Sequence, residues 1–247
     1  MTRQRSLPLA NAPSQSNDIE AAQRWADNGV MIADVAKLHL NRDMRSIDVT
    51  YGTGVWWKSW KPKKLVKHDL YTVDGVDFCH LPHRAASFDL WAFDPEYVAQ
   101  GGRKTSKLAY NSRYGMLTAP ATPKLLRAQI VEGLREGHRI LRPGGTGLFK
   151  CMNYVSSGHL QLGAKWGIDD AEEVGFEIHD IFYFIGNVRS QPLTRRQIVR
   201  TPDGKPDLDA DGNKVYDMLP YPQQHARTNI SMLLVLRKKP LRKKATK

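Results

Sequence analysis

The clearest element in the pattern of apolar and polar positions is a short apolar run at Phe88-Asp-Leu-Trp-Ala-Phe93. A run of this length, nearly continuous in large apolar residues, is typical of a central parallel strand that is covered on both faces. It stops abruptly at Asp94 and Pro95, and Tyr97 follows after one intervening residue, Glu96. Because ligands bind at the carboxyl ends of strands in open α/β sheets, the pattern predicts a buried strand that positions a functional site.

The rest of the chain alternates between segments with the periods of strands and of helices. Arg45–Trp57 predicts a strand that ends near Asp48, a turn containing Gly52 and Gly54, and the start of a helix. Further strands are predicted at Leu65–Asp69, Thr146–Met152, Phe176–Ile185 and Ile230–Leu236, and further helices from Asp18 through Trp25, at Val30–Leu40 and at Leu125–Ile140, with Asn28-Gly29 ending the first of them. This alternation indicates an α/β fold built on a mostly parallel sheet.

The length of 247 residues suits one α/β domain with a sizeable core. We expect residues 1–17, which are rich in Ser, Pro, Asn and Gln, to be a flexible lead-in, and residues 18–236 to form the domain. Residues 187–228 are polar and contain Asp-Gly pairs typical of hairpin turns, so they are predicted to be an insert in that domain. The basic residues 237–247 are predicted to be a C-terminal tail.

The composition is that of a soluble globular protein, with 41% hydrophobic and 25% charged residues, but the charge is unbalanced. Lys and Arg number 37 against 25 Asp and Glu, and the resulting charge of +12 favours a polyanionic partner and salt-sensitive binding. The two cysteines, Cys79 and Cys151, argue for a reducing compartment and against a disulfide scaffold. No apolar run approaches the roughly 18 residues of a membrane span, and no secretory signal is visible, so we expect a cytoplasmic protein with no membrane partner.

The residues after the apolar run suggest a specific chemistry. A carboxylate and a proline carbonyl can both accept hydrogen bonds from an exocyclic amino group, and a tyrosine ring can stack on a flipped-out base. Asp94-Pro-Glu-Tyr97 resembles the Asp-Pro-Pro-Tyr motif of amino-methyltransferases, which move a methyl group from S-adenosylmethionine to adenine N6 or cytosine N4. The resemblance implies that Asp94 and the Pro95 carbonyl hold the amino group and that Tyr97 stacks on the base, with Glu96 replacing the second proline. It also implies a Rossmann-like class I methyltransferase fold: a mostly parallel seven-stranded sheet with an antiparallel last strand and helices on both faces.

The same resemblance implies S-adenosylmethionine as the cofactor, bound along the preceding strand ends. Asp48 and the glycine turn resemble the motif that lies under the methionine part. Asp69 takes the place of the acid that accepts both ribose hydroxyls. Asp77 and Phe78 take the places of the acid that meets the adenine amino group and of the apolar residue that packs on the ring. The predicted cofactor-binding residues are Asp48, Tyr51, Gly52, Gly54, Asp69, Asp77 and Phe78.

Two polar segments are predicted to contact nucleic acid. Residues 101–115 follow the predicted catalytic strand and mix cations, which suit phosphates, with tyrosines, which suit bases. The insert 187–228 carries several arginines and is the candidate for target recognition. The predicted contacts are Arg103, Lys104, Arg113, Tyr114, Arg189, Arg195 and Arg196. With these segments included, the chain from about Asp48 to Arg237 resembles bacterial and phage site-specific DNA methylases of the restriction-modification kind, so DNA is the expected partner, in a bacterial cell or a phage-infected host.

Three alternatives remain open. An RNA methyltransferase of the same fold could use the same amino-group motif. A ribose 2′-O-methyltransferase would place its catalytic lysine near Lys150, although the second lysine and the glutamate of that set have no convincing counterparts here. A nucleic-acid binding protein without activity is the third, because Glu96 departs from the motif. Cytosine-C5 chemistry is not expected, since neither cysteine follows a proline, and Cys79, His80 and His83 match no standard zinc spacing, so no metal is predicted.

Overall fold

The computed structural model describes residues 19–97, 99, 120, 122–156, 159–186, 194–220 and 230–240. Its elements in chain order are β1 (Ala22–Gln23), α1 (Asn28–His39), β2 (Arg45–Asp48), the 3-10 helix η1 (Val55–Trp57), β3 (Lys64–Lys67), β4 (Phe88–Phe93), α3 (Pro123–Ile140), β5 (Leu141–Cys151), β6 (Tyr154–Ser156), β7 (His159–Gln161), α4 (Gly163–Val174), β8 (Phe176–Ile185), β9 (Thr194–Ile198), β10 (Tyr216–Pro220) and β11 (Ile230–Lys238).

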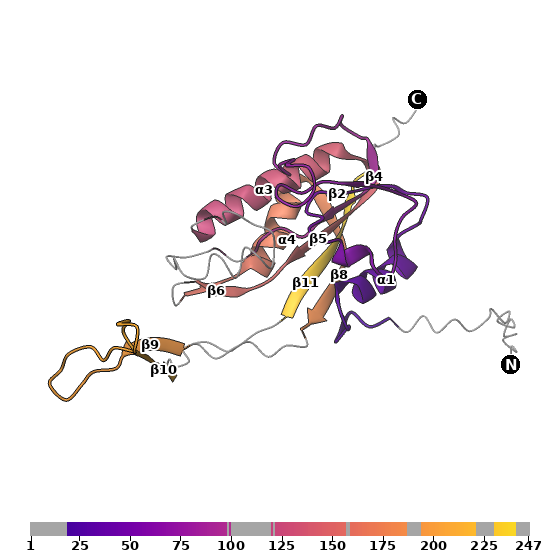
Figure 1. Cartoon of the computed structure of the whole chain (residues 1–247). Coiled ribbons are helices and arrows are strands. Elements are labelled where there is room, and N and C mark those ends of the chain that lie inside the picture. The colour runs from indigo at the N-terminus through magenta and orange to yellow at the C-terminus, as the bar shows by residue number, and fades with distance from the viewer. Residues whose placement is uncertain are drawn as a thin grey trace, which may run out of the picture.

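Seven strands form one sheet in the order β1-β8-β11-β5-β4-β2-β3 (Figure 1). Strand β11 is antiparallel to both of its neighbours, β5 and β8. The other pairs, β1 with β8, β2 with β3, β2 with β4, and β4 with β5, are parallel. The mostly parallel, Rossmann-like seven-stranded sheet with an antiparallel last strand, predicted from the sequence, is therefore confirmed.

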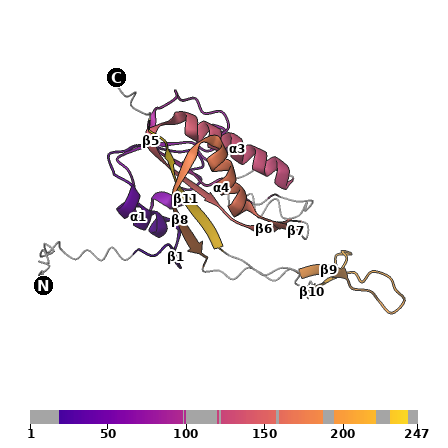
Figure 2. The ribbon, with the colours of Figure 1, turned by 180° about the vertical axis from the view of Figure 1, so that it is seen from behind.

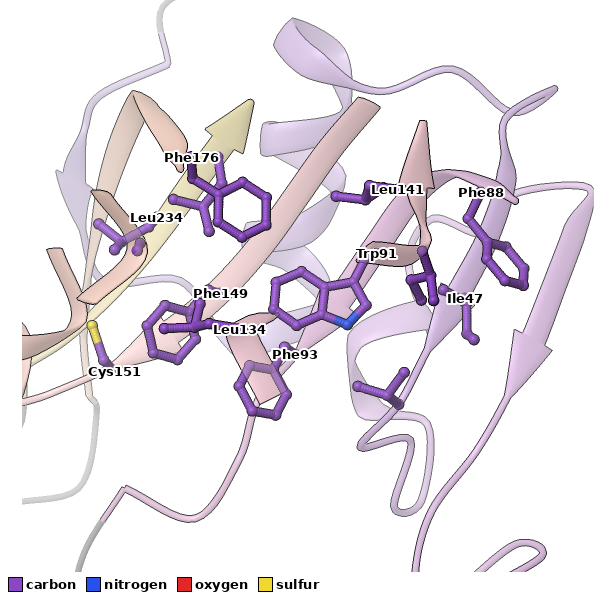
Figure 3. Packing of buried hydrophobic residues seen from close by; sticks show 14 of the residues in the cluster. Ile47, Phe88, Trp91, Phe93, Leu134, Leu141, Phe149, Cys151, Phe176 and Leu234 are labelled. Atoms are coloured by element: carbon purple, nitrogen blue, oxygen red, sulfur yellow. The ribbon is translucent and has the colours of Figure 1, made fainter. Parts of the chain in front are cut away.

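Helices cover both faces of this sheet, and β4 contributes to both cores. Helices α3 and α4 lie on one face and α1 on the other (Figures 1 and 2). Trp91 and Phe93 point into the cluster under α3 and α4 (Figure 3), whereas Leu90 and Ala92 join the cluster under α1 and η1. All four side chains are fully buried. The alternation explains why β4 is apolar almost without interruption: neither of its faces meets water.

Two glycines let α3 approach β4 closely. A Cβ added at Gly137 would lie 2.4 Å from Trp91 Cε2, and one at Gly133 would lie 2.5 Å from Phe93 Cζ. Real Cβ atoms do not come that close to ring carbons, because packed interiors have no room to absorb an extra methyl group. The helix can therefore press directly onto the strand that leads to Asp94.

The first predicted helix is wrong. Ala22–Gln23 is extended and pairs in parallel with β8, so that Ala22 lies opposite Tyr183. Trp25 stacks on Phe184 at 6.2 Å and donates a 2.8 Å hydrogen bond to Asp34, which favours an extended approach over the local helix propensity. Asn28 and Gly29 open α1, which Asp27 caps, and do not end a helix. Gly29 is needed for packing, since a Cβ there would lie 2.7 Å from the Val55 carbonyl oxygen.

The last strand is longer than predicted. β11 runs through Arg237 and Lys238, two residues beyond the expected end. The Arg237 guanidinium donates to Thr146 Oγ1, and Lys238 Nζ donates to the carbonyl oxygens of His138 and Leu141 at 2.7 and 2.9 Å. The first two residues of the basic C-terminal segment therefore belong to the sheet.

The described part of the insert is an antiparallel hairpin of β9 and β10. Gly204 and Gly212, the glycines of the two Asp-Gly pairs, have φ of +81° and +79°, the left-handed conformation of tight turns. Both views show the hairpin standing away from the sheet (Figures 1 and 2). In the part of the chain that the structure describes, no helix has the length and apolar character needed to cross a bilayer.

Candidate functional site

Three acidic residues meet at the carboxyl ends of β2, β3 and β4. Asp48 ends β2, while Asp69 and Asp94 follow β3 and β4. The strand ends are tied together, since His68 N donates to the Asp48 carbonyl at 2.8 Å and Asp94 N donates to Thr50 Oγ1 at 2.7 Å. Burial is the main cause that raises the pKa of Asp48, and the negative charges of Asp94 and Asp69 add to it, as expected for neighbouring carboxylates. The structure thus brings these three predicted site residues together.

The turn between β2 and η1 leaves open space beside its backbone. Gly52 and Gly54 have φ of +53° and +73°, which glycine adopts without strain. A Cβ added at Gly52 would have only the Thr50 carbonyl oxygen nearby, at 4.0 Å, so a ligand can approach the backbone there. A Cβ at Gly54 would lie 2.4 Å from the Tyr51 hydroxyl oxygen. Gly54 therefore makes room for Tyr51, whose ring also faces Lys67 Nζ at 4.8 Å.

Asp48 is a buried carboxyl that orders this turn. It is 3% exposed, and its Oδ2 accepts from Trp57 Nε1 at 2.6 Å while its Oδ1 accepts from Thr50 N at 3.0 Å. Burial raises the pKa of Asp48 to about 7, and these two hydrogen bonds oppose the rise. Since both oxygens already have donors, the geometry gives Asp48 a role in shaping the loop.

Asp69 is largely occupied by the backbone around it. Its Oδ2 accepts from Gly52 N at 2.9 Å, and its Oδ1 accepts from Tyr71 N and Thr72 N at 2.9 and 2.8 Å. A carboxylate can accept about four hydrogen bonds in total. Asp69 therefore has capacity for about one further donor, whereas the predicted role toward two ribose hydroxyls needs two.

Asp77 and Phe78 are also partly engaged. Asp77 Oδ1 accepts from Cys79 N at 2.8 Å, its Oδ2 lies 3.5 Å from His80 Nδ1, and its side chain is 38% exposed. The Phe78 ring packs edge-on against Phe93 at 5.0 Å, on the margin of the core. Asp77 can still receive a donor from outside, and Phe78 presents only part of its ring.

Asp94 has one carboxylate oxygen without a partner. Its Oδ2 accepts from Trp56 Nε1 at 3.0 Å and lies 4.0 Å from Lys150 Nζ. Its Oδ1 is buried and has no hydrogen-bond partner among the described residues, although a quarter of the side chain is exposed. Burial raises the pKa of Asp94, and the Lys150 cation and the Trp56 hydrogen bond act against it. The next residue, Pro95, is buried.

Lys150 lies beside this carboxylate on the α1 face of β5. Its side chain is 5% exposed, and Nζ donates to Asn28 Oδ1 at 3.1 Å. The ammonium also lies 5.9 Å from the centre of the Tyr97 ring and 5.6 Å from that of Phe184. A buried cation is held best by acceptors and aromatic faces, and Lys150 has both. Tyr97 is thus brought to the same group of side chains as Asp94.

A small cavity lies on the other side of Tyr97. Its volume is about 20 Å³, and its lining includes Phe149, Cys151, Tyr154 and Trp166. That volume is about what one water molecule needs. A nucleobase does not fit there unless the surrounding side chains move.

Most of the predicted nucleic-acid contacts lie outside the described residues. This applies to the segment 101–115, with Arg103, Lys104, Arg113 and Tyr114, and to Arg189 in the insert. Arg195 and Arg196 are in β9, opposite Leu219 and Met218 of β10, and only their backbone is described. Within the described chain, no group of three or more His, Cys, Asp or Glu side chains is placed to hold a metal ion.

Sequence reasoning missed three residues that complete the site. The indole N–H groups of Trp56 and Trp57 donate hydrogen bonds to the carboxylates of Asp94 and Asp48. The hydroxyl oxygen of Thr50 accepts a hydrogen bond from the backbone N–H of Asp94. The available signal was a pair of tryptophans directly after the glycine turn, because a buried indole N–H usually needs an acceptor. Which acceptors they reach depends on how η1 folds back over β2 and β4.

No protein-family model matches the chain, and no curated protein is significantly similar to it. Solved structures with a similar fold include a provisionally assigned methyltransferase from Bacillus halodurans C-125, with 15% identity over 87% of this chain and 100% of that chain and a TM-score of 0.45. An S-adenosylmethionine-dependent methyltransferase from Thermotoga maritima is 12% identical over 85% of this chain and 89% of that chain, with a TM-score of 0.36.

A provisionally named DNA modification methylase from Thermus thermophilus is 15% identical over 67% of this chain, with a TM-score of 0.36. The match covers 52% of that protein, so the present chain spans about half its length. At such identities and TM-scores these likenesses give no basis for choosing a substrate. The residues at the carboxyl edge of the sheet therefore carry the evidence for function.

Proposed function

We propose that the protein transfers a methyl group from S-adenosylmethionine to the exocyclic amino nitrogen of adenine (N6) or cytosine (N4) in DNA. The observation that carries this proposal is the buried Oδ1 of Asp94, which has no hydrogen-bond partner among the described residues, next to an Oδ2 that Trp56 holds in place. A buried acceptor without a donor costs about 1 to 3 kcal/mol, so a donor that reaches it binds favourably. An amino group provides that donor, and the Pro95 carbonyl is the second acceptor in the proposed site.

In this proposal Asp94 acts on the reacting nitrogen directly. Its Oδ1 accepts one amino hydrogen, which increases electron density on the nitrogen at the moment a bond to carbon forms. Trp56 fixes the carboxylate, and the Lys150 cation favours its ionised form. When the nitrogen has gained the methyl group it loses a proton, which Asp94 is placed to accept. Because Oδ1 is covered, side chains around it move when the base enters, and Tyr97 then stacks on the base.

The cofactor residues act mainly by positioning. S-adenosylmethionine, when bound, would supply an electrophilic methyl group from its sulfonium sulfur, with S-adenosylhomocysteine as the leaving group. Gly52 gives it access to the backbone, Asp69 accepts one ribose hydroxyl with its remaining capacity, and Asp77 accepts from the adenine amino group. Asp48 keeps the turn in shape through Trp57.

DNA is the proposed substrate because of the resemblance to DNA methylases, and the charge of +12 suits such a polyanion. Phosphate contacts are proposed for the segment 101–115 and for Arg189, Arg195 and Arg196. The described hairpin is itself neutral. Its five cations are Arg195, Arg196, Arg200, Lys205 and Lys214, and its five acids are Asp203, Asp207, Asp209, Asp211 and Asp217. A neutral two-stranded ribbon suits base reading in the major groove, which admits such a ribbon, better than it suits general affinity. The insert 187–228 is therefore proposed as the target-recognition element.

Ribose 2′-O-methylation is the second candidate, and the 4.0 Å separation of Lys150 and Asp94 favours it. In that reaction the lysine would have to accept the hydroxyl proton. Here Lys150 Nζ already donates to Asn28 Oδ1 and faces a carboxylate and two aromatic rings, so these contacts occupy it. The amino-group reaction needs no change in the state of Lys150.

The test compares three purified proteins for transfer of a labelled methyl group to unmodified genomic DNA. The parent should be active and Asp94→Ala inactive by at least about 10²-fold, which is typical for loss of one preorganised acceptor. Lys150→Ala should keep measurable turnover. On an RNA sample treated in parallel, activity in Asp94→Ala with none in Lys150→Ala would favour ribose chemistry, because DNA has no 2′-hydroxyl to methylate. Cofactor binding by the parent without transfer to DNA or RNA would mean an inactive binder.

A further inference from the structure

The described domain carries a concentration of positive charge that the proposed site does not use. Residues 42–67 hold seven cations, Arg42, Arg45, Lys58, Lys61, Lys63, Lys64 and Lys67, against two acids, Asp43 and Asp48. Between Lys58 and Lys67 there is no acid at all. We call Arg42, Lys58, Lys61, Lys63, Lys64 and Lys67 the basic strip. It lies on and beside β3, the last strand of the sheet on that side.

The backbone of the strip is held in a defined shape. Lys63 N donates to the Arg42 carbonyl at 2.7 Å, and the Arg42 guanidinium donates to the Lys61 carbonyl at 3.5 Å. The guanidinium also lies 6.0 Å from the ring of Trp60, which is partly buried against the core under α1 and η1. Exposed cations on a preorganised backbone lose less conformational freedom when they bind a row of charges.

Protection of an edge strand explains only part of the strip. Lysines on edge strands discourage pairing with other chains, and Lys64 and Lys67 fit that role because they lie on β3. Arg42, Lys58 and Lys61 lie outside any strand, so edge protection does not explain them. Of the strip's lysines, Lys63 is paired with an acid, Asp43, at 2.7 Å between side chains that are 65% and 70% exposed.

The strip is continuous with the proposed site and opposite in charge to helix α4. Its last member, Lys67, lies 4.8 Å from the Tyr51 ring in the glycine turn. Helix α4, which packs across β5, β8 and β11, carries one cation, Lys165, and four acids, Asp169, Asp170, Glu172 and Glu173. Asp170 is buried against Arg127 and Asp169 is paired with Lys165, so α4 offers no unpaired cation to a polyanion. A polyanion approaching the carboxyl edge is therefore attracted along β3 and not along α4.

We infer that the basic strip binds the phosphate backbone of duplex DNA and leads it along the β3 edge to the carboxyl ends of the strands. β3 rises about 13 Å over its four residues, which matches roughly four phosphates of one DNA strand at about 3.4 Å of axis each. The inference rests on the proposed function for its choice of DNA, and adds a surface that lies outside the predicted nucleic-acid contacts.

The test measures binding of a labelled 20-base-pair duplex between 50 and 200 mM salt. The strip variant is Lys58→Ala/Lys61→Ala/Lys64→Ala, in which all three positions are exposed. If each lysine contacts a phosphate, the slope of log K against log salt should become shallower by about 2 to 3 units. The ratio of the affinity at 50 mM salt to the affinity at 200 mM salt should then be up to roughly 40-fold smaller in the strip variant than in the parent.

The matched control is Lys37→Ala/Arg135→Ala/Lys165→Ala, which removes the same net charge from side chains that are 63%, 58% and 64% exposed. Its slope should change by less than about 1 unit. Three results overturn the inference: a strip variant with the parent slope, an equal change in both variants, or a parent that does not bind duplex DNA. If the strip variant has a shallower salt slope but the parent never methylates DNA, the inference about the strip stands and the proposed function does not. If the parent methylates DNA but the strip variant keeps the parent's salt slope, the proposed function stands and the inference about the strip does not.

Discussion

Replacing Lys150 with Met should make methyl transfer more sensitive to acid. Lys150 Nζ lies 4.0 Å from Asp94 Oδ2 and is the larger of the two influences that lower the raised pKa of Asp94. Coulomb's law gives about 4 kcal/mol for that distance at an effective dielectric constant of 20 and about 1 kcal/mol in water. Loss of the cation raises the pKa of Asp94 further, so less of it is ionised at a given acidic pH.

The acidic limb of the pH–rate profile should therefore move to higher pH, while the plateau stays within a few-fold of the parent. Even the lower figure of about 1 kcal/mol lowers the rate on that limb roughly fivefold. Methyl transfer from labelled cofactor, measured from about pH 5.5 to 9 on one DNA preparation, gives the profile. Asn28→Ala is the matched control, because it removes the 3.1 Å partner of Lys150 and keeps the charge. An unmoved limb in Lys150→Met would refute the role of Asp94 ionisation, and loss of activity at every pH in a folded variant would point to Lys150 as a base.

Three further predictions concern the glycine turn and its acids. Asp69→Ala should lower S-adenosylmethionine affinity by at least about tenfold, since a charged hydrogen bond is worth about 1.5 to 3 kcal/mol and the Gly52 amide loses its acceptor. Calorimetry on the folded variant measures this affinity, and an unchanged value would remove Asp69 from the site. Gly54→Ala should destabilise the fold by more than the roughly 1 to 2 kcal/mol that a left-handed alanine costs, because its Cβ would lie 2.4 Å from the Tyr51 hydroxyl oxygen. Gly52→Ala should show only the cost of the left-handed alanine in denaturant melts, because its Cβ has open space around it, and should lose cofactor affinity. The folded-state pKa of Asp48, about 7, is above its ordinary value of 3.8, so its contribution to stability is complete below about pH 4 and is lost as pH rises through 7. Relative to Asp48→Asn, the parent should therefore lose up to roughly 4 kcal/mol of unfolding free energy between pH 4 and 8. A stability difference between the two proteins that stays constant with pH would contradict the effect of burial.

Two strands could be predicted with their bounds, because their large apolar and aromatic residues favour extended structure. β4 has the predicted bounds, and the predicted strand Phe176–Ile185 coincides with β8. The N-terminal segment could not be predicted from local pattern. Ala22 and Gln23 are extended because β8 offers an open edge more than 150 residues later in the chain, and a local helix signal contains no information about that edge.

The candidate site also has a part that could be predicted from the sequence and a part that could not. Acids at successive strand ends could be predicted to converge, because parallel strands place their carboxyl ends at one edge, and Asp48, Asp69 and Asp94 do so. Their hydrogen-bond partners could not be predicted. Trp56 reaches Asp94 and Lys150 reaches Asn28 across 38 and 122 residues of sequence. These contacts decide which carboxylate oxygen stays open, and they depend on the packing of η1 and α1 against the sheet.

The most direct measurement of the central claim is the identity of the methylated atom. Unmodified genomic DNA is treated with the parent protein and isotopically labelled S-adenosylmethionine, digested to nucleosides and analysed by mass spectrometry, with Asp94→Ala treated in parallel. We expect label in N6-methyladenine or N4-methylcytosine from the parent and none from Asp94→Ala. Label in 5-methylcytosine, label in 2′-O-methylated nucleosides of an RNA sample treated alongside with none in DNA, or equal labelling by Asp94→Ala would contradict it.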